Sequence, residues 1–359
     1  MSPAWEDPGE LGNFVTDKGC ELRCHSRMEK LYPLLMKPLF DPRPWGRVDL
    51  SPIYPRKFDE KIGESWLTGD NCLAQNGPLA GQTLAELSAQ YKRELVGEAP
   101  RDDHRFPLLL KFLFPQEKLS VQVHPDDAAA QEVGEPCGKT ECWYVVAAEP
   151  GAEIGLGLKP GVTRDEFERS IREQRAEDLL NWIKVSAGDM IYVAGGTVHT
   201  LGPGSIIVET QQQSDTTYRL YDYGRPRELH LKDGLRVIKE NVRAGKVQPE
   251  VPQTLNGGSS KRQRLVASSY FAVEKYDLRS AHEFAAAPGK SSAQIIVATE
   301  GAGILQAPGC EPARFRKGDA VVVPAAVSQF EVQPDANVQF IRSFVPGTPV
   351  SGPEIVNSR

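Results

Sequence analysis

The sequence predicts a mainly β protein in which two regions of short strands follow one another along the chain. Short apolar runs of strand-type composition recur in the central and C-terminal parts, separated by turns that contain glycine and proline. Helical periodicity is confined to a few short segments. Residues 187–193 are also echoed by residues 317–323, each a glycine turn that feeds a buried strand. This weak internal repeat indicates that the second half of the chain copies the scaffold of the first.

The N-terminal part of the chain shows little regular periodicity. Residues 1–34 form a polar arm without a clear apolar face. Residues 38–55 are rich in proline and aromatic side chains, so we expect them to be extended and irregular. A short helix is expected over residues 83–91.

The central part carries the strands and two longer helices. We expect a helix over 163–183, because Thr163 and Glu166 form a capping box at its start. A second helix is expected over 228–243, after Pro226. Strands are expected over 107–114, 118–124, 141–147, 189–193, 205–211 and 217–223.

A segment rich in proline, glycine, serine and basic residues separates the two halves. We therefore expect an N-terminal arm (1–34), a first domain (35–250), a linker (251–265) and a second domain (266–359). When the repeat is aligned on its apolar runs, His199 falls opposite Gln329, and Glu141 falls opposite Ser292. The second copy thus repeats the scaffold and lacks these polar groups.

The composition excludes several classes of protein. The chain has 359 residues, of which 40% are hydrophobic and 25% charged, as is ordinary for a soluble globular protein. Its net charge of −6 gives no reason to expect a nucleic-acid partner, although a small anionic substrate fits a site with its own basic residues. The most apolar run, 108–114, is too short to span a membrane, and the N-terminus has no secretory signal. We expect a cytoplasmic protein.

The six cysteines do not have the spacing of a disulfide framework. Cys20, Cys24 and His25 could suggest zinc, but no second Cys/His pair nearby completes four ligands. We interpret them as thiols in the arm.

One predicted strand carries polar groups on a single face. Alternate side chains of a strand share a face, so Leu119, Val121 and Val123 form an apolar face. The opposite face then carries Ser120, Gln122 and His124. Taken alone, this pattern is typical of a half-buried strand with one solvated face.

Two further residues turn this face into a candidate metal site. Glu141 begins the next apolar strand, and His199 follows the strand and glycine turn of the repeat. An antiparallel barrel brings such strand ends together. With Gln122 and His124 they provide two imidazoles, a carboxylate and an amide oxygen, a mixed set suited to Zn, Mn, Co or Fe(II).

These residues resemble the cupin family, whose two short motifs place ligands on opposite strands of a small barrel. The second cupin motif, G-x5-P-x-G-x2-H, matches Gly188, Gly196 and His199, with Ala194 in place of the proline. In the first motif Gln122 replaces the first histidine, and Glu141 stands 141 − 124 = 17 residues after His124 rather than about four. The resemblance implies two jelly-roll cupin barrels, the second degenerate, with a short helical insert.

One branch of the cupins matches more closely. Residues 119–126, 139–144, 196–199 and 209–222 resemble type I mannose-6-phosphate isomerases of the compact bacterial form, and the likeness extends over about residues 34–346. The chain departs from this family at two positions. Thr140 stands where members often have proline, and Gly138 stands where some members have histidine.

The resemblance implies a reaction and assigns roles to residues. The expected reaction interconverts mannose 6-phosphate and fructose 6-phosphate by moving a proton between C2 and C1 through a cis-enediol. A metal ion, Zn²⁺ first and otherwise Mn, Co or Fe(II), would be held by the four ligands. The family likeness suggests Lys111 and Ser120 as phosphate contacts, and Arg219 as an active-site arginine. The proton-transfer candidates are Lys139 and Asp215, between which the sequence does not decide.

Several of these residues also have plain structural interpretations. Lys111 could be a polar residue at a strand edge, Asp215 could cap a turn, and Arg219 could pair with Asp222. We expect Arg225 and Arg227 to be solvated or paired, and Trp143 and Tyr144 to belong to the core. Glu209 and His230 are candidates for groups that support the site from behind. Residues 155–161 are interpreted as an ordinary turn rather than a phosphate loop.

Two other functions compete with this interpretation. The first is isomerisation of a different phosphosugar, which would use the same metal. The second is a non-catalytic sugar-phosphate-binding cupin, such as a sensor. The complete ligand set, together with Lys139 and Arg219, argues against a decayed site.

Overall fold

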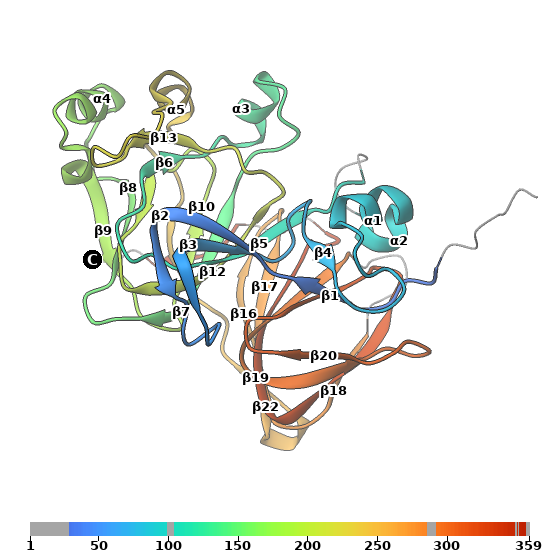
Figure 1. Cartoon of the computed structure of the whole chain (residues 1–359). Helices are drawn as coiled ribbons and strands as arrows, with labels where there is room; N and C mark the ends of the chain where they lie inside the picture. The colour runs from blue at the N-terminus through green and yellow to red at the C-terminus, as the bar shows by residue number, and fades with distance from the viewer. Residues whose placement is uncertain (1–28, 99–103, 286–291, 349, 351, 357–359) are drawn as a thin grey trace, which may run out of the picture. The chain divides into compact units, whose positions relative to one another are not determined.

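Antiparallel strands make up most of the regular secondary structure, as the sequence predicts (Figure 1). The computed structural model describes residues 29–98, 104–285, 292–348, 350 and 352–356. Residues from Leu31 onward form one unit, and the remaining description concerns this unit. The cysteine and histidine cluster at 20–25 lies outside the described residues. Among the cysteines that the structure describes, none forms a disulfide.

Two sheets build the first half of the unit. The first sheet has eight strands in the order β2–β3–β5–β12–β7–β10–β14–β23. Their bounds are β2 Leu39–Asp49, β3 Lys57–Trp66, β5 Leu108–Leu113, β12 Ser205–Gln212, β7 Glu141–Ala148, β10 Met190–Val193, β14 Gly245–Val247 and β23 Ile355–Val356. The second sheet has the order β13–β6–β11–β8–β9. Its strands are β13 Tyr218–Tyr221, β6 Val121–Val123, β11 His199–Leu201, β8 Glu153–Leu158 and β9 Leu180–Lys184.

A third sheet of ten strands builds the second half. Its main path is β15–β16–β17–β22–β19–β21–β1–β4, with β18 paired to β22 and β20 paired to β19. The strands are β15 Gln253–Leu255, β16 Ser260–Ala267, β17 Ala272–Leu278, β22 Gln329–Phe344, β19 Gln294–Gln306, β21 Ala320–Val323, β1 Leu34–Lys37, β4 Leu73–Ala74, β18 His282–Ala285 and β20 Ala313–Arg316. The helices are α1 Leu84–Tyr91, α2 Arg93–Val96, α3 Asp127–Glu132, α4 Arg164–Arg172 and α5 Leu231–Val237, with 3₁₀ turns η1 Ala176–Leu179 and η2 Asn256–Gly258. None of the helices in the described ranges is long and apolar enough to cross a membrane.

Apolar side chains between the two sheets of the first half form one of the cores. Trp143, Val145, Ile154 and Ile191 are almost fully buried there. At about 25 cal/mol per Å² of buried apolar surface, each large side chain contributes on the order of 2 kcal/mol. Trp143 and Tyr144 are therefore core residues, as expected. This packing fixes the strand ends at which the polar candidates lie.

Stacked aromatic side chains fill part of the interior of the second half. Phe284 stacks on Phe330 with ring centroids 4.7 Å apart, and Tyr276 stacks on Phe340 at 5.1 Å. All four side chains are buried. These rings belong to the apolar core of the second half.

The two longer helices are shorter than predicted. Helix α4 begins with the expected capping box of Thr163 and Glu166, but it ends at Arg172 rather than near 183. Gln174 has a positive φ of 58°, and Leu180 is buried in β9, where it pairs with Leu158. Helix α5 covers only Leu231–Val237 of the predicted 228–243. In both cases tertiary pairing overrides the local helical pattern.

Strands occur both in the segment that we expected to be extended and irregular and in the expected linker. Residues 39–49 form β2, which pairs with β3 through an irregular register. Within the expected linker 251–265, strands β15 and β16 pair with each other. Two strands near the ends of the described chain also cross between the halves: β1 pairs with β21, and β23 pairs with β14.

The structure confirms the internal repeat and corrects its register. Gly188 and Gly318 both have φ near 90°, and their amides donate to Val145 and Ala298 respectively. Val193 pairs with Glu141, whereas Val323 pairs with Gln294. The residue equivalent to Glu141 is therefore Gln294, and the predicted Ser292 is wrong by two positions. The alignment of two uniformly apolar strands is weakly defined by sequence, because apolar residues match one another after any shift.

The corrected register relates further residues of the two halves. Glu209 pairs with Trp143 and Lys111, and at the equivalent place Arg342 pairs with Ile296 and Glu274. The next residues along these strands, Thr210 and Ser343, are also equivalent, and their hydroxyls lie 3.1 Å apart. The two halves thus contact each other through equivalent residues. Beside that contact the charges are reversed: Glu209 and Lys111 in the first half correspond to Arg342 and Glu274 in the second.

The two turn glycines provide a matched test of the fold. Changing Gly188 to alanine places a Cβ in open space, so we expect only the cost of the positive φ, about 1–2 kcal/mol. Changing Gly318 to alanine brings the Cβ to 2.7 Å from the ring of Tyr54, whose hydroxyl also donates to the Gly318 carbonyl. We expect this variant to lose about 1–3 kcal/mol more. Urea unfolding of both variants measures the difference; equal losses would contradict this account of Gly318.

Candidate metal centre and active site

Three buried ligand-type side chains meet at the strand ends of the first half. His124 follows β6, Glu141 begins β7 and His199 begins β11. The pairing of His199 with Gln122 aligns β11 with β6. One ligand atom from each of His124, Glu141 and His199 lies within 4.8 Å of the others, and each residue is at most 1% exposed.

Hydrogen bonds orient both imidazoles toward the centre of this cluster. Nδ1 of His124 lies 2.9 Å from the Thr216 carbonyl, and Nδ1 of His199 lies 2.9 Å from the Thr197 carbonyl. Because a carbonyl only accepts, each Nδ1 donates, and each Nε2 keeps a free lone pair. Each Nε2 lies 3.5 Å from a Glu141 carboxylate oxygen.

Gln122 adds a fourth group beside the two histidines. Its Nε2 lies 3.2 Å from Nε2 of His199, and its Oε1 lies 3.4 Å from the Ser120 hydroxyl. Rotating the side-chain amide by 180° exchanges these two atoms and brings the oxygen to the centre. The four expected ligands are therefore adjacent in the structure.

The cluster has the chemistry of a metal site. Nε2 of His124 and both Glu141 oxygens are buried and have no hydrogen-bond partner among the described residues. Unpaired buried polar atoms are costly, and a carboxylate facing two neutral imidazoles suits a divalent cation. Burial lowers the pKa of His124 well below its usual range and lowers that of His199 to about 4. Both imidazoles are then neutral near pH 7, as metal binding requires.

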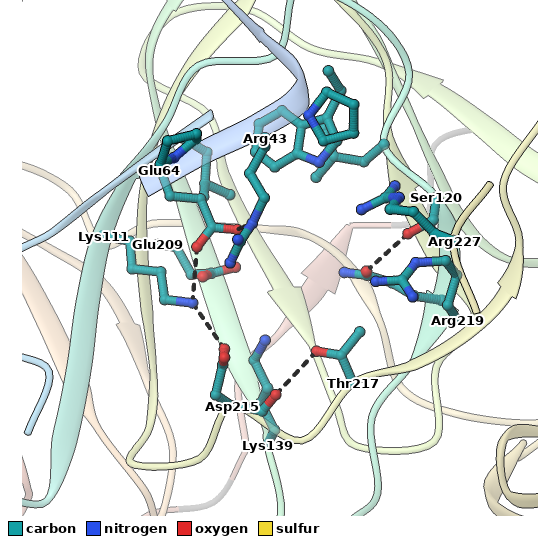
Figure 2. Close-up of a pocket in the computed structure, with 16 residues that line it drawn as sticks. Arg43, Glu64, Lys111, Ser120, Lys139, Glu209, Asp215, Thr217, Arg219 and Arg227 are labelled. Carbon is teal, nitrogen blue, oxygen red and sulfur yellow. Dashed lines mark hydrogen bonds and ion pairs between the residues drawn. The ribbon is translucent and has the colours of Figure 1, made fainter. Parts of the chain in front are cut away.

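A polar pocket of about 500 Å³ opens beside the cluster. Figure 2 shows Lys111, Asp215 and Glu64 on one side of it and Ser120, Arg219 and Arg227 on the other. Gln122 and Lys139 line it as well, which connects the pocket to the cluster.

The Lys111 side of the pocket holds a buried ion network. Nζ of Lys111 lies 3.3 Å from Glu64 and 3.0 Å from Asp215, and it stands 4.0 Å above the Trp66 ring. Burial disfavours the ammonium, but the two carboxylates outweigh it and raise the pKa of Lys111. Burial likewise opposes ionisation of Glu64, yet Lys111 and Arg43 lower the pKa of Glu64 to about 2. Lys111 is thus a buried cation rather than a residue at a strand edge.

Lys139 lies between this network and the candidate ligands. It precedes β7, is 5% exposed, and its Nζ lies 3.6 Å from Oε2 of Glu141. Asp215, the other proton-transfer candidate, is half exposed and pairs with Lys111. Both candidates therefore face the pocket that holds Gln122.

The arginines on the other side differ in their partners. Arg225 and Arg227 both pair with Asp222, so the pairing of Arg219 with Asp222 that we considered is wrong. Arg219 instead donates from Nη1 to the Glu228 carbonyl, and its buried Nε has no hydrogen-bond partner among the described residues. Arg219 is thus a pocket cation that has no carboxylate within ion-pair distance in the described part of the chain.

Glu209 and His230 support neighbouring side chains rather than the cluster directly. Glu209 accepts a hydrogen bond from the Trp143 indole, and Trp143 packs against the His199 ring at 5.4 Å. Nδ1 of His230 accepts from the Arg219 amide, and the His230 amide donates to the Arg219 carbonyl. His230 therefore fixes the backbone of Arg219.

Four polar residues of this pocket were not predicted from the sequence as site residues: Arg43, Glu64, Thr217 and Arg227. Arg43 enters because β2 bulges between Pro42 and Arg47, both of which pair with Ile62. Gly63 makes room for the bulge, since a Cβ there would lie 2.5 Å from Cβ of Arg43. The prolines at 42 and 44 were a signal of an interrupted strand. Arg227 had been expected only to be solvated or paired.

The strand architecture and the ligand cluster together define a metal-binding cupin. Residues 261–345 match the family model of the mannose-6-phosphate isomerase cupin domain, and residues 49–159 match that of the phosphomannose isomerase type I catalytic domain. This confirms the cupin fold expected from the sequence.

Similar proteins identify the family within the cupins. The chain is 36% identical to mannose-6-phosphate isomerase ManA of Bacillus subtilis over 84% of its length and 96% of that protein. It is 34% identical to the mannose-6-phosphate isomerase of Streptococcus mutans, over 85% of its length and 96% of that protein. The crystal structure of the Bacillus subtilis mannose 6-phosphate isomerase superposes with a TM-score of 0.77 and 32% identity, covering 87% of this chain and 99% of that one. The chain belongs to the type I phosphomannose isomerase family.

Glu209 allows a test of the electrostatics of the metal-free site. Burial, reinforced by Glu141, raises the pKa of Glu209 from 4.5 to about 7. A raised carboxyl pKa means that folding takes up a proton, so stability falls as the pH rises from about 4.5 to 7. Gln accepts the same bond from Trp143 without ionising. We expect chelator-treated Glu209→Gln to gain up to about 3 kcal/mol over the wild type at pH 8 and little at pH 4.

Thermal unfolding at the two pH values measures this effect. Glu64→Gln is the control with the opposite sign, because the pKa of Glu64 is lowered and its carboxylate stabilises the fold above pH 4.5. That variant is expected to be less stable than the wild type at pH 8. A gain for Glu209→Gln that is the same at pH 4 and pH 8 would contradict the raised pKa.

Proposed function

We propose that the chain interconverts mannose 6-phosphate and fructose 6-phosphate as a metal-dependent aldose–ketose isomerase. The observation that carries this proposal is the pocket itself, which joins a buried two-histidine, one-carboxylate cluster to a wall of arginines. Membership of the type I phosphomannose isomerase family supports the same reaction. The substrate is a small phosphosugar.

The metal would be held by Gln122, His124, Glu141 and His199. We propose Zn²⁺, because two imidazoles, a carboxylate and an amide oxygen form a ligand set that zinc accepts; Mn, Co and Fe(II) accept it too. When bound, such an ion supplies a Lewis acid that polarises the sugar oxygens. Glu209 and Trp143 support the His199 ring from behind.

The proton transfer falls to Lys139 or Asp215. In the direction of fructose 6-phosphate, a base removes the proton from C2 of the open-chain aldose and returns it to C1, while the hydroxyl proton moves from O2 to O1. Lys139 lies close to Glu141, so its Nζ would lie near the reacting carbons, where it would accept the proton as the neutral amine. Asp215, held by Lys111, is the alternative base. Arg219 is proposed to stabilise negative charge that develops on the sugar.

The substrate phosphate is proposed to bind at the Ser120 side of the pocket. Ser120, Arg219 and Arg227 lie together there, and guanidinium groups bind phosphate oxygens with paired hydrogen bonds (Figure 2). Lys111 lies on the opposite side, so we propose that it contacts the sugar end of the substrate near Asp215 and Lys139. In this arrangement Ser120 and Lys111 both bind the substrate, but they do not both bind its phosphate.

Some of the sequence predictions concern properties beyond the pocket. A cytoplasmic location and the division into an arm, two domains and a linker stay predictions. We propose them together with the isomerase activity, since the acidic chain and its small substrate call for neither a membrane nor a nucleic acid.

Turnover before and after metal removal tests the activity. We expect purified protein to convert mannose 6-phosphate in a coupled assay, to lose turnover with a chelator, and to regain it with Zn, Mn or Co. Glu141→Gln is expected to lose bound metal and to lower kcat by more than about 100-fold, because it removes the one carboxylate of the cluster. Glu153→Gln on β8 is the control. Metal binding without turnover would redirect the assignment to another phosphosugar or to a binding protein.

Two arginines that share Asp222 test the phosphate site. Arg227 lines the pocket whereas Arg225 does not, although both pair with Asp222. We expect Arg227→Ala to raise KM for mannose 6-phosphate about 10- to 100-fold, the value of one lost charge-assisted hydrogen bond of about 1.5–3 kcal/mol. Arg225→Ala is expected to change KM less than about threefold. Equal effects of the two substitutions would refute phosphate binding by Arg227.

A further inference from the structure

A short segment behind the ligand cluster joins all the strand ends that carry the candidate ligands. Pro125, which follows His124, accepts a hydrogen bond at its carbonyl from the Lys139 amide at 2.9 Å. The carbonyl of His124 accepts from the Gly196 amide at 2.7 Å, three residues before His199. The segments that lead to Glu141 and to His199 are thus both anchored to residues 124–125.

Two glycines let this segment approach the other strand ends closely. A Cβ on Gly138 would lie 2.5 Å from the carbonyl carbon of Asp126 and 2.6 Å from the amide nitrogen of Asp127. A Cβ on Gly195 would lie 2.7 Å from Cα of Asp126. Since real Cβ atoms do not approach so closely, any side chain at either glycine pushes the segments apart. Gly138, a departure from the family pattern, is therefore required by the packing of this chain.

Side chains complete the connection around Lys139. Oδ1 of Asp127 accepts from the Gly138 amide at 2.8 Å and from Nε2 of Gln212 at 2.9 Å. Oε1 of the same Gln212 accepts from the Thr140 amide at 2.9 Å. The backbone amides of Gly138 and Thr140, on either side of Lys139, are thus held by the side chains of Asp127 and Gln212, which bond to each other.

From this geometry we infer that Asp127, acting through Gln212 and the 138–140 backbone, is a positioning residue for Lys139 and Glu141. The inference rests on the proposed function for the role of Lys139, and on the ligand cluster for the role of Glu141. Nζ of Lys139 lies 3.6 Å from Glu141, so a small shift of this backbone changes both groups together. Misplacing a catalytic group by about 1 Å can cost a factor of about 100 in rate.

The neighbouring Asp126 has a different function, which makes it a matched control. Its side chain accepts from the Ala129 amide at 3.0 Å as the N-cap of α3 and pairs with Lys239. An Asp→Asn change there keeps the cap and reaches neither Gly138 nor Gln212. The two adjacent aspartates therefore separate local helix stability from positioning.

The test compares Asp127→Ala, Asp127→Asn and Asp126→Asn in the zinc-loaded full chain. The first readout is the rate of zinc release to a coloured chelator, which does not require turnover. Asp127→Ala is expected to release zinc at least about tenfold faster, because the Glu141 segment loses its anchor. The second readout is steady-state kinetics, in which its kcat is expected to fall about 10- to 100-fold with KM changed less than about threefold.

The conservative variant distinguishes hydrogen bonding from charge. Asn at 127 keeps an amide oxygen that accepts both bonds, so Asp127→Asn is expected to stay within about threefold of the wild type in both readouts. Asp126→Asn is expected to match the wild type. Should Asp127→Ala fail to fold, Gln212→Leu breaks the same pair, and the same changes in zinc release and kcat are expected from it.

The inference is overturned if Asp127→Ala and Gln212→Leu lower only the melting temperature, with zinc release and kcat unchanged. It is equally overturned if Asp127→Asn is as impaired as Asp127→Ala. A wild-type protein that holds zinc but does not convert mannose 6-phosphate would instead refute the proposed function, while the zinc-release comparison would still decide the role of Asp127.

Discussion

The burial of one carboxylate between two imidazoles is the constraint around which the first half is built. Glu141 is completely buried, and burial raises the pKa of its carboxyl. Neither of its oxygens has a hydrogen-bond partner among the described residues. Ionisation of such a group needs positive charge nearby; Lys139 supplies part of it from 3.6 Å, and a metal ion between the imidazoles would supply the rest. The glycine contacts and the fixed Nδ1 atoms of the histidines maintain that geometry.

The pocket next to this centre separates paired charges from unpaired ones. On one side Lys111, Arg43, Glu64 and Asp215 neutralise one another in a network that holds its own geometry. On the other side Arg219 has no carboxylate partner within ion-pair distance among the described residues, and Arg227 shares Asp222 with Arg225. An anionic ligand therefore gains most on the arginine side, whereas the lysine side offers a fixed, oriented ammonium. The asymmetry gives a phosphosugar a defined direction in the site.

Features set by neighbouring residues in the sequence were predicted correctly, whereas features set by distant strands were not. The alternation in residues 119–124 correctly placed Val121 and Val123 in the core with Gln122 on the opposite, pocket-lining face. The capping box at Thr163 correctly located the start of α4, because the signal is contained within four residues. The end of that helix was not predictable in this way, since it depends on the pairing of Leu180 with a distant strand. Arg43 was missed for a related reason, as its bulge depends on a glycine across the sheet.

In the second half, an arginine side chain provides the positive charge near the position that corresponds to the metal cluster. At the position equivalent to Glu141, Gln294 accepts a hydrogen bond from Nε of Arg342, and Arg342 also pairs with the buried Glu274. A guanidinium thus stands permanently near the place where the first half calls for an ion. Among the described residues, this half therefore carries its own positive charge at that place, between an amide oxygen and a buried carboxylate.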